Sequence, residues 1–274
     1  MADGPSYQVP PILLALCSPG SIRVETAMAV SEALRHCDKM GLQIQVGHFG
    51  GALVDKARND AARTALKGGF GAVLYIDGDM VFGKDAIMRL VQSAYLDAPW
   101  ADAIGAYCVL RGGAVPTIDT GTGTWESHYP GSGILEVIRT GGAFLLVKMH
   151  CLQRFPEPWF ACRFPSRWLD AMADLDNLAR TLCDGRNPFA DLPAWAACLD
   201  KARTDPQART ATAGYEIGED SGFCDRAKFA GLRIAVDTNI SIGHLDTVVL
   251  DGDTHKRKMD ERAKETRLIY GVLV

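Results

Sequence analysis

The 274 residues carry 29 basic and 33 acidic side chains, which leaves a formal net charge of −4. This balance provides no general attraction to nucleic acid or to an anionic membrane, although a local basic groove would be compatible with it. Apolar residues make up 47% and charged residues 23% of the chain, proportions that predict a packed globular core. The eight cysteines include no Cys-x-x-Cys pair, which favours reduced thiols and a cytoplasmic protein over a disulfide framework or zinc site.

The first eleven residues are polar and contain prolines, and no basic stretch precedes the first apolar run. They therefore do not predict a signal peptide. The run itself, Ile12–Cys17, is far shorter than the roughly 20 residues that a membrane-spanning helix needs. We expect no membrane span, one domain over residues 1–247 and a charged C-terminal tail over 248–274.

Strand and helix patterns alternate along the first part of the chain. Short apolar or alternating runs predict strands at 12–17, 42–46, 72–76 and 103–107. Apolar residues at helical spacing predict helices over 24–37, 54–65 and 87–94. Gly41 and the pair Gly68-Gly69 lie where helix C-caps belong. This alternation is typical of an α/β protein with a mostly parallel sheet covered on both faces.

The second part of the chain is less regular. Residues 112–133 are rich in Gly and Thr and predict a long loop. Paired strands are expected at 135–139 and 143–147, around Thr140-Gly141-Gly142. Residues 154–209 contain many prolines, three tryptophans and short helix-like segments, and we interpret them as an insertion within the domain. Glu219 and Asp220 precede a further helical pattern.

An acidic motif, Asp77-Gly-Asp79, directly follows the expected strand at 72–76. Ligands of parallel sheets bind beyond the carboxyl ends of the strands, where these carboxylates should lie. Mg²⁺ and Mn²⁺ prefer such oxygen ligands and leave coordination positions for phosphate and water. Asp-Gly is also an ordinary turn signal, and a second copy occurs at Asp251-Gly-Asp253. That copy borders the charged tail, so we favour the first.

Five motifs then follow one another: Arg58-Asn59, Asp77-Gly-Asp79, Thr140–Ala143, Glu219-Asp220 and His244. In this order they resemble the family 2-like glycosyltransferases of the GT-A fold, over roughly residues 10–247. The resemblance implies a Rossmann-like mixed, mostly parallel sheet with helices on both faces and an inserted segment. It also implies a hexosyltransferase-like enzyme that transfers a sugar from a nucleotide-sugar, expected to be a UDP-sugar. The acceptor stays open: a glycan, a small molecule, a protein or a modified nucleic acid.

The resemblance also implies roles for the acidic residues. Asp79 and His244 would hold Mn²⁺ or Mg²⁺, with Asp77 near the ribose and a metal-bound water. Asp220 would be the base that deprotonates the acceptor hydroxyl, beside Glu219. A carboxylate base suggests inversion at the anomeric carbon. The motif lacks the further Asp common in close family 2 members, and acids in the first turn of a helix are also favoured by the helix dipole.

The resemblance also implies contacts between the donor and six further residues. Ser18, Pro19, Arg58 and Asn59 would lie near the nucleotide base, and Gly141 and Gly142 would let the donor sugar approach closely. From the aromatic character of the 154–209 insertion, we expect Trp159 or Trp168 to face the cleft and bind the acceptor. Each residue also has a purely structural alternative: a solvated helix face, a hairpin turn, or a core aromatic cluster.

Two other functions compete with this hypothesis. A haloacid-dehalogenase-like phosphatase also places Asp-x-Asp after a buried strand, with a nucleophilic first Asp and a later acidic pair for Mg²⁺. The segment before Glu219 is small and polar rather than a buried strand, which counts against it. A non-catalytic nucleotide-sugar-binding module would bind the donor without turnover. Fold alone does not decide among these functions.

Overall fold

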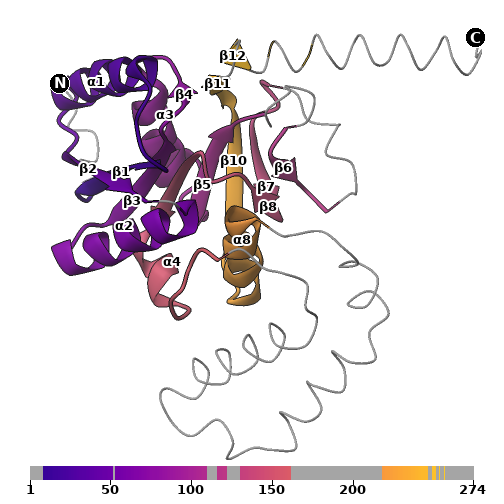
Figure 1. The fold of residues 1–274 in the computed structure, drawn as a ribbon. Helices are drawn as coiled ribbons and strands as arrows, with labels where there is room; N and C mark the ends of the chain where they lie inside the picture. Colours follow the sequence, from indigo (N-terminus) through magenta and orange to yellow (C-terminus); the bar gives the residue numbers. More distant parts are fainter. Residues whose placement is uncertain are drawn as a thin grey trace, which may run out of the picture.

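The computed structural model describes residues 9–51, 53–109, 116–121, 130–161, 218–245, 249–250, 253 and 256. A seven-stranded sheet in the order β2-β1-β3-β9-β5-β10-β7 forms its centre (Figure 1). Five of its strands share one direction, and β9 and β7 run against them. The predicted mixed, mostly parallel sheet is therefore confirmed. The sheet strands are β1 Ile12–Ser18, β2 Ile44–Gly50, β3 Ala72–Asp77, β5 Ala103–Tyr107, β7 Ile134–Val137, β9 Phe144–Lys148 and β10 Ile234–Ser241.

Helices cover both faces of this sheet (Figure 1). The helices are α1 Val24–Lys39, α2 Val54–Gly68, α3 Ala86–Gln92, the π-helical turn η1 Ser93–Asp97, α4 Met149–Gln153 and α8 Glu219–Phe229. Buried side chains of α1 and α3 share one apolar cluster, and those of α2, α4 and α8 share another. Within the described part of the chain, no helix is long and apolar enough to cross a membrane.

The N-terminal elements form for the reasons that the sequence predicts. All seven residues of β1 are buried, as expected for a strand covered on both faces. Ala57, Ala61 and Ala65 give α2 a narrow buried stripe at helical spacing. Gly69 ends this helix in the left-handed conformation, with φ 70°, which glycine adopts without strain. The expected strands and helices up to Tyr107 are all present.

The expected strand pair around Gly141-Gly142 is wrong. β7 pairs with β10 at the edge of the sheet, whereas β9 lies between β3 and β5 and pairs antiparallel with both. All five residues of β9 are buried, so a central position removes more apolar surface from water than a local hairpin would. A short strand, β8 (Arg139–Thr140), pairs instead with β6 (Ile118–Asp119).

The carboxyl edge of the sheet gathers several chain segments. β1 ends at Ser18 and β3 ends at Asp77, while the antiparallel β9 begins beside them, so that the Asp77 N–H donates to the Ala143 carbonyl at 3.0 Å. β10 has an irregular register near its end, between Asp237 and Ser241. The chain then continues into β11 (Gly243–Leu245), which pairs antiparallel with β4 (Met80–Val81) and with β12 (Val249–Leu250).

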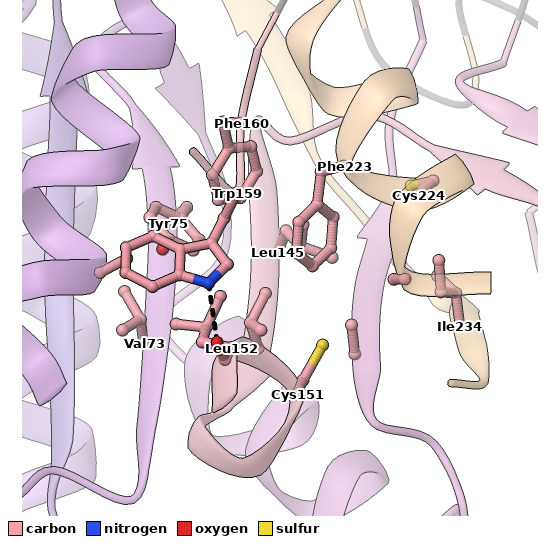
Figure 2. Close-up of a cluster of buried hydrophobic side chains, with 14 of the residues drawn as sticks. Val73, Tyr75, Leu145, Cys151, Leu152, Trp159, Phe160, Phe223, Cys224 and Ile234 are labelled. Carbon is pink, nitrogen blue, oxygen red and sulfur yellow. Dashed lines mark hydrogen bonds between the residues drawn. The ribbon is translucent and has the colours of Figure 1, made fainter. Parts of the chain in front are cut away.

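Trp159 lies inside the apolar cluster on the face of the sheet that α2, α4 and α8 cover (Figure 2). Only 6% of it is exposed, and its indole N–H donates to the Leu152 carbonyl at 2.7 Å and the Phe155 carbonyl at 3.1 Å. The expectation that Trp159 faces the cleft is therefore wrong, because its ring is a core group whose polar end is already hydrogen-bonded. Trp168 lies outside the described residues.

Candidate active site

A pocket of about 1020 Å³ opens at the carboxyl edge of the sheet. Ten of the predicted site residues line it, although they come from positions up to 226 residues apart in the sequence. They are Ser18, Pro19, Arg58, Asp77, Asp79, Gly141, Gly142, Glu219, Asp220 and His244. The pocket also contains residues that sequence analysis did not single out, among them Cys17, Arg23 and Thr117. Arg23 lies three residues after Gly20, close to the Ser18–Gly20 loop, and this proximity in sequence was the signal that could have identified it.

Arg58 lies among the carboxylates of this pocket rather than at a separate base-binding position. It is 2% exposed, and its Nη2 donates to both oxygens of Asp77, at 2.9 and 3.1 Å. Its Nη1 forms an ion pair with Glu219. Burial by itself lowers the pKa of Arg58, but Asp77, Glu219 and Asp220 outweigh it and leave that pKa above its ordinary value. The guanidinium is therefore a permanent positive charge under the pocket.

Asn59 does not line the pocket, so its predicted contact with a nucleotide base is wrong. Its amide nitrogen donates to the carbonyl oxygens of Asp55 and Phe160, at 2.8 and 2.6 Å. Its amide oxygen accepts the N–H groups of Trp159 and Phe160, at 2.8 and 3.1 Å. Both donors and both acceptor positions of this carboxamide are thus used by the backbone, and none is left for a ligand.

Gly141 and Gly142 line the pocket, and neighbouring side chains approach both residues closely. A Cβ at Gly142 would be 2.6 Å from the guanidinium carbon of Arg58, and one at Gly141 would be 3.0 Å from Thr117. The Gly142 N–H also donates to Asp220 Oδ2 at 3.2 Å. These glycines therefore permit the Arg58 ion pairs and bring a backbone donor to Asp220; they do not form the tight hairpin that remained open as an alternative.

Replacing Gly142 by Ala should destabilise the protein by about 1–3 kcal/mol, the usual cost of forcing extra volume into a packed site. The new methyl group would displace a guanidinium that is 2% exposed and ion-paired with Asp77 and Glu219. Gly20→Ala is a matched control, because a Cβ there meets nothing within 4 Å. Urea denaturation measures both variants, and equal midpoints for the two would contradict this account.

Glu219 and Asp220 begin α8 and enter the pocket from the face of the sheet that α2 and α8 cover. Burial raises the pKa of Glu219 above its ordinary value, Arg58 opposes this shift, and the neighbouring Asp220 adds to it. The carboxylate of Asp220 accepts two backbone N–H groups, from Ser221 at 2.7 Å and from Gly142 at 3.2 Å. Of the two acids, Glu219 is the one with a basic partner.

Asp79 and His244 are brought together by the β4–β11 pair. His244 lies opposite Met80, and the N–H of Leu245 donates to the Asp79 carbonyl at 2.8 Å. His244 Nδ1 is 2.8 Å from the Val109 carbonyl oxygen, which can only accept, so this nitrogen carries the proton in the neutral ring. Nε2 then presents a lone pair, the arrangement that metal-binding histidines use.

The pocket carries more negative than positive charge. Its lining contains four carboxylates, at Asp77, Asp79, Glu219 and Asp220, against the guanidinium groups of Arg23 and Arg58. Arg58 is already committed to two of the carboxylates. No group of three or more His, Cys, Asp or Glu that could hold a metal occurs among the described residues. Among the described residues, no more than two such side chains are therefore grouped closely enough to hold one cation.

The sheet order, the helices on both faces and the pocket at the carboxyl edge define a GT-A-like Rossmann fold. No family model and no curated protein matches the sequence. Among solved structures, the crystal structure of A197 from STIV is similar, with 15% identity, a TM-score of 0.52, and coverage of 89% of this chain and 91% of that chain. The identity is low, so this likeness concerns the fold.

Two other solved structures are similar over about half of this chain, and the first of them is described as a glycosyltransferase. One is involved in the glycosylation of the major capsid of PBCV-1, and matches over 53% of this chain and 63% of its own, with 12% identity and a TM-score of 0.30. The other is residues 1–349 of S. aureus TarS in complex with UDP-GlcNAc, with 14% identity, coverage of 53% of this chain and 48% of that chain, and a TM-score of 0.33.

Proposed function

We propose that this protein is a metal-dependent glycosyltransferase that moves a sugar from a nucleoside-diphosphate sugar, a UDP-sugar, to an acceptor hydroxyl. The proposal rests on one observation: a single pocket is lined by Asp79 and His244, by the two acids of α8, and by the two glycines Gly141 and Gly142. These groups provide a cation site, a base and room for a sugar. A volume of about 1020 Å³ is ample for a nucleotide-sugar.

The charge of the pocket supports a need for a divalent cation. Four carboxylates against two guanidinium groups would repel a diphosphate, so bound positive charge has to offset them. Asp79 and Nε2 of His244 would hold Mn²⁺ or Mg²⁺, and diphosphate oxygens and water would complete its shell. Such an ion neutralises the charge that develops on a departing diphosphate.

Asp220 is the residue to which we assign the base. A carboxylate has about four lone-pair positions, and two backbone N–H groups occupy only two of those of Asp220. The remaining positions can accept the proton of an acceptor hydroxyl as its oxygen attacks the anomeric carbon and the diphosphate leaves. Glu219 is held by Arg58 and serves to orient the cluster. Direct displacement by such an oxygen inverts the anomeric configuration.

The phosphatase alternative receives no support from the arrangement of these groups. It requires Asp77 as a nucleophile, but Arg58 Nη2 contacts both of its oxygens, at 2.9 and 3.1 Å. A carboxylate whose two oxygens accept hydrogen bonds from a buried guanidinium is a weaker nucleophile. The non-catalytic binding module differs from our proposal in turnover alone, and release of free nucleotide from a UDP-sugar in the presence of an acceptor mixture distinguishes the two.

Calorimetry of UDP binding tests the cation requirement. With Mn²⁺ present, Asp79→Ala should weaken UDP binding by more than the roughly 10–100-fold that loss of an outer-shell partner costs at metal sites. Asp85→Ala, at an exposed position shortly after β4, is the matched control and should bind as the unaltered protein does. Equal UDP affinity in the presence of EDTA would rule out the proposed cation.

A further inference from the structure

Two adjacent residues of α2 hold two stretches of chain that are far apart in the sequence. Asn59 makes three of its four side-chain hydrogen bonds with the backbone of Trp159 and Phe160. Arg58 forms an ion pair with Glu219, 161 residues away. The first stretch ends at residue 161 and the second begins at residue 218, on either side of residues 162–217. One turn of α2 is thus the common attachment of both ends.

The two attached stretches also contact each other directly. The rings of Phe160 and Phe223 are stacked, with centroids 4.6 Å apart and planes 10° apart, and Figure 2 shows them side by side between the sheet and α8. Arg226 Nη2 donates to the Pro156 carbonyl at 2.8 Å. The loop before residue 161 and the first turns of α8 therefore form one packed unit on α2.

This unit ends at the pocket. Beyond the Arg58–Glu219 ion pair, the next residue, Asp220, accepts the N–H of Gly142, whose Cα lies against the same guanidinium. The N-cap residue of α8 is Gly218, which has no side chain that could cap the helix. The position of its first turn is therefore determined by contacts with α2, with Phe160 and with Gly142 rather than by a local cap.

We infer that Arg58 and Asn59 are positioning residues, which fasten the loop before residue 161 and the start of α8 to α2 and thereby hold Asp220 against Gly142 at the pocket. The importance of Asp220 for activity rests on the proposed function; the attachment itself does not. A buried carboxamide whose four hydrogen bonds are all made to the backbone is costly to remove, because its partners are left unpaired.

Hydrogen–deuterium exchange of the unliganded protein tests the attachment. In Asn59→Ala, amides of residues 159–160 and 222–227 should exchange faster, by on the order of tenfold, while those of β3 keep their rates. Lys56→Gln, at an exposed position of the same helix, is the control. Phe223→Leu, which removes the stacked ring but leaves every hydrogen bond of Asn59, should give a smaller increase confined to α8. The inference would be overturned if amide exchange became faster to the same extent in β3 and in α8, or if exchange in α8 did not change.

A second measurement separates positioning from simple stability. Arg58→Lys keeps a positive charge but loses the planar fork that contacts Asp77 and Glu219 together. It should lower kcat for sugar transfer while the KM for the donor changes little, because Asp79 and His244 are untouched. An equal loss in the Lys56→Gln control would count against the inference. If the unaltered protein turns over no donor, the proposed function fails, and the exchange experiment still decides the attachment.

Discussion

Replacement of Asp220 by Asn is expected to lower sugar transfer by roughly 10²–10⁴-fold, the usual contribution of a positioned general base. Asn has the size of Asp, and its side-chain oxygen can still accept one of the two backbone N–H groups that contact Asp220. It cannot accept a proton from an acceptor hydroxyl at neutral pH. Donor binding should stay nearly intact, because the proposed cation site at Asp79 and His244 is separate.

Two variants on the same helix sharpen this test. Asp225→Asn removes a carboxylate that pairs with Arg139 and does not line the pocket, so its transfer rate should be close to that of the unaltered protein. Glu219→Gln should affect folding more than chemistry, since it loses the ion pair with Arg58. Initial rates and UDP calorimetry measure all three variants. Transfer by Asp220→Asn at a near-normal rate would refute the base assignment, and the anomeric configuration of the product, read by NMR, would then show whether the reaction retains or inverts.

Replacement of Arg58 by Met is expected to destabilise the protein by about 3–5 kcal/mol, as removal of one partner from a buried ion pair commonly does. Met fills much of the same space, so the loss comes from charge rather than from a cavity. Asp77 and Glu219 would remain close together without their common partner. With a total stability typically near 5–15 kcal/mol, a loss of this size would be visible in any urea titration.

A more exposed ion pair on the same helix provides a control for Arg58. Arg63 also pairs with two acids, Asp60 and Glu157, but it is 37% exposed, so Arg63→Gln should cost no more than about 1 kcal/mol. Adding Glu219→Gln to Arg58→Met should restore part of the lost stability, because one unpaired buried acid is removed. If the double variant is less stable than Arg58→Met by the full cost of Glu219→Gln alone, the two side chains do not interact energetically.

The spacing of apolar residues in the sequence was sufficient to predict the individual helices and strands of the first part of this protein. The buried runs at β1 and β3 and the alanine stripe of α2 can each adopt only one favourable structure, because a continuous apolar run must be covered on both sides and a stripe must face a sheet. The same logic placed Asp77 and Asp79 at the carboxyl edge. The order of the motifs along the chain was enough to predict ten of the residues that line the pocket.

Tertiary structure decided the roles that depend on partners distant in sequence. The pairing of β9 was not predictable locally, because its insertion between β3 and β5 depends on how much surface each arrangement buries. Nothing around Asn59 in the sequence reveals that its carboxamide is used up by the backbone of Trp159 and Phe160, nor that Trp159 is a core residue. The type of a polar residue determines which hydrogen bonds its side chain can make. Only the folded chain determines which groups become its partners.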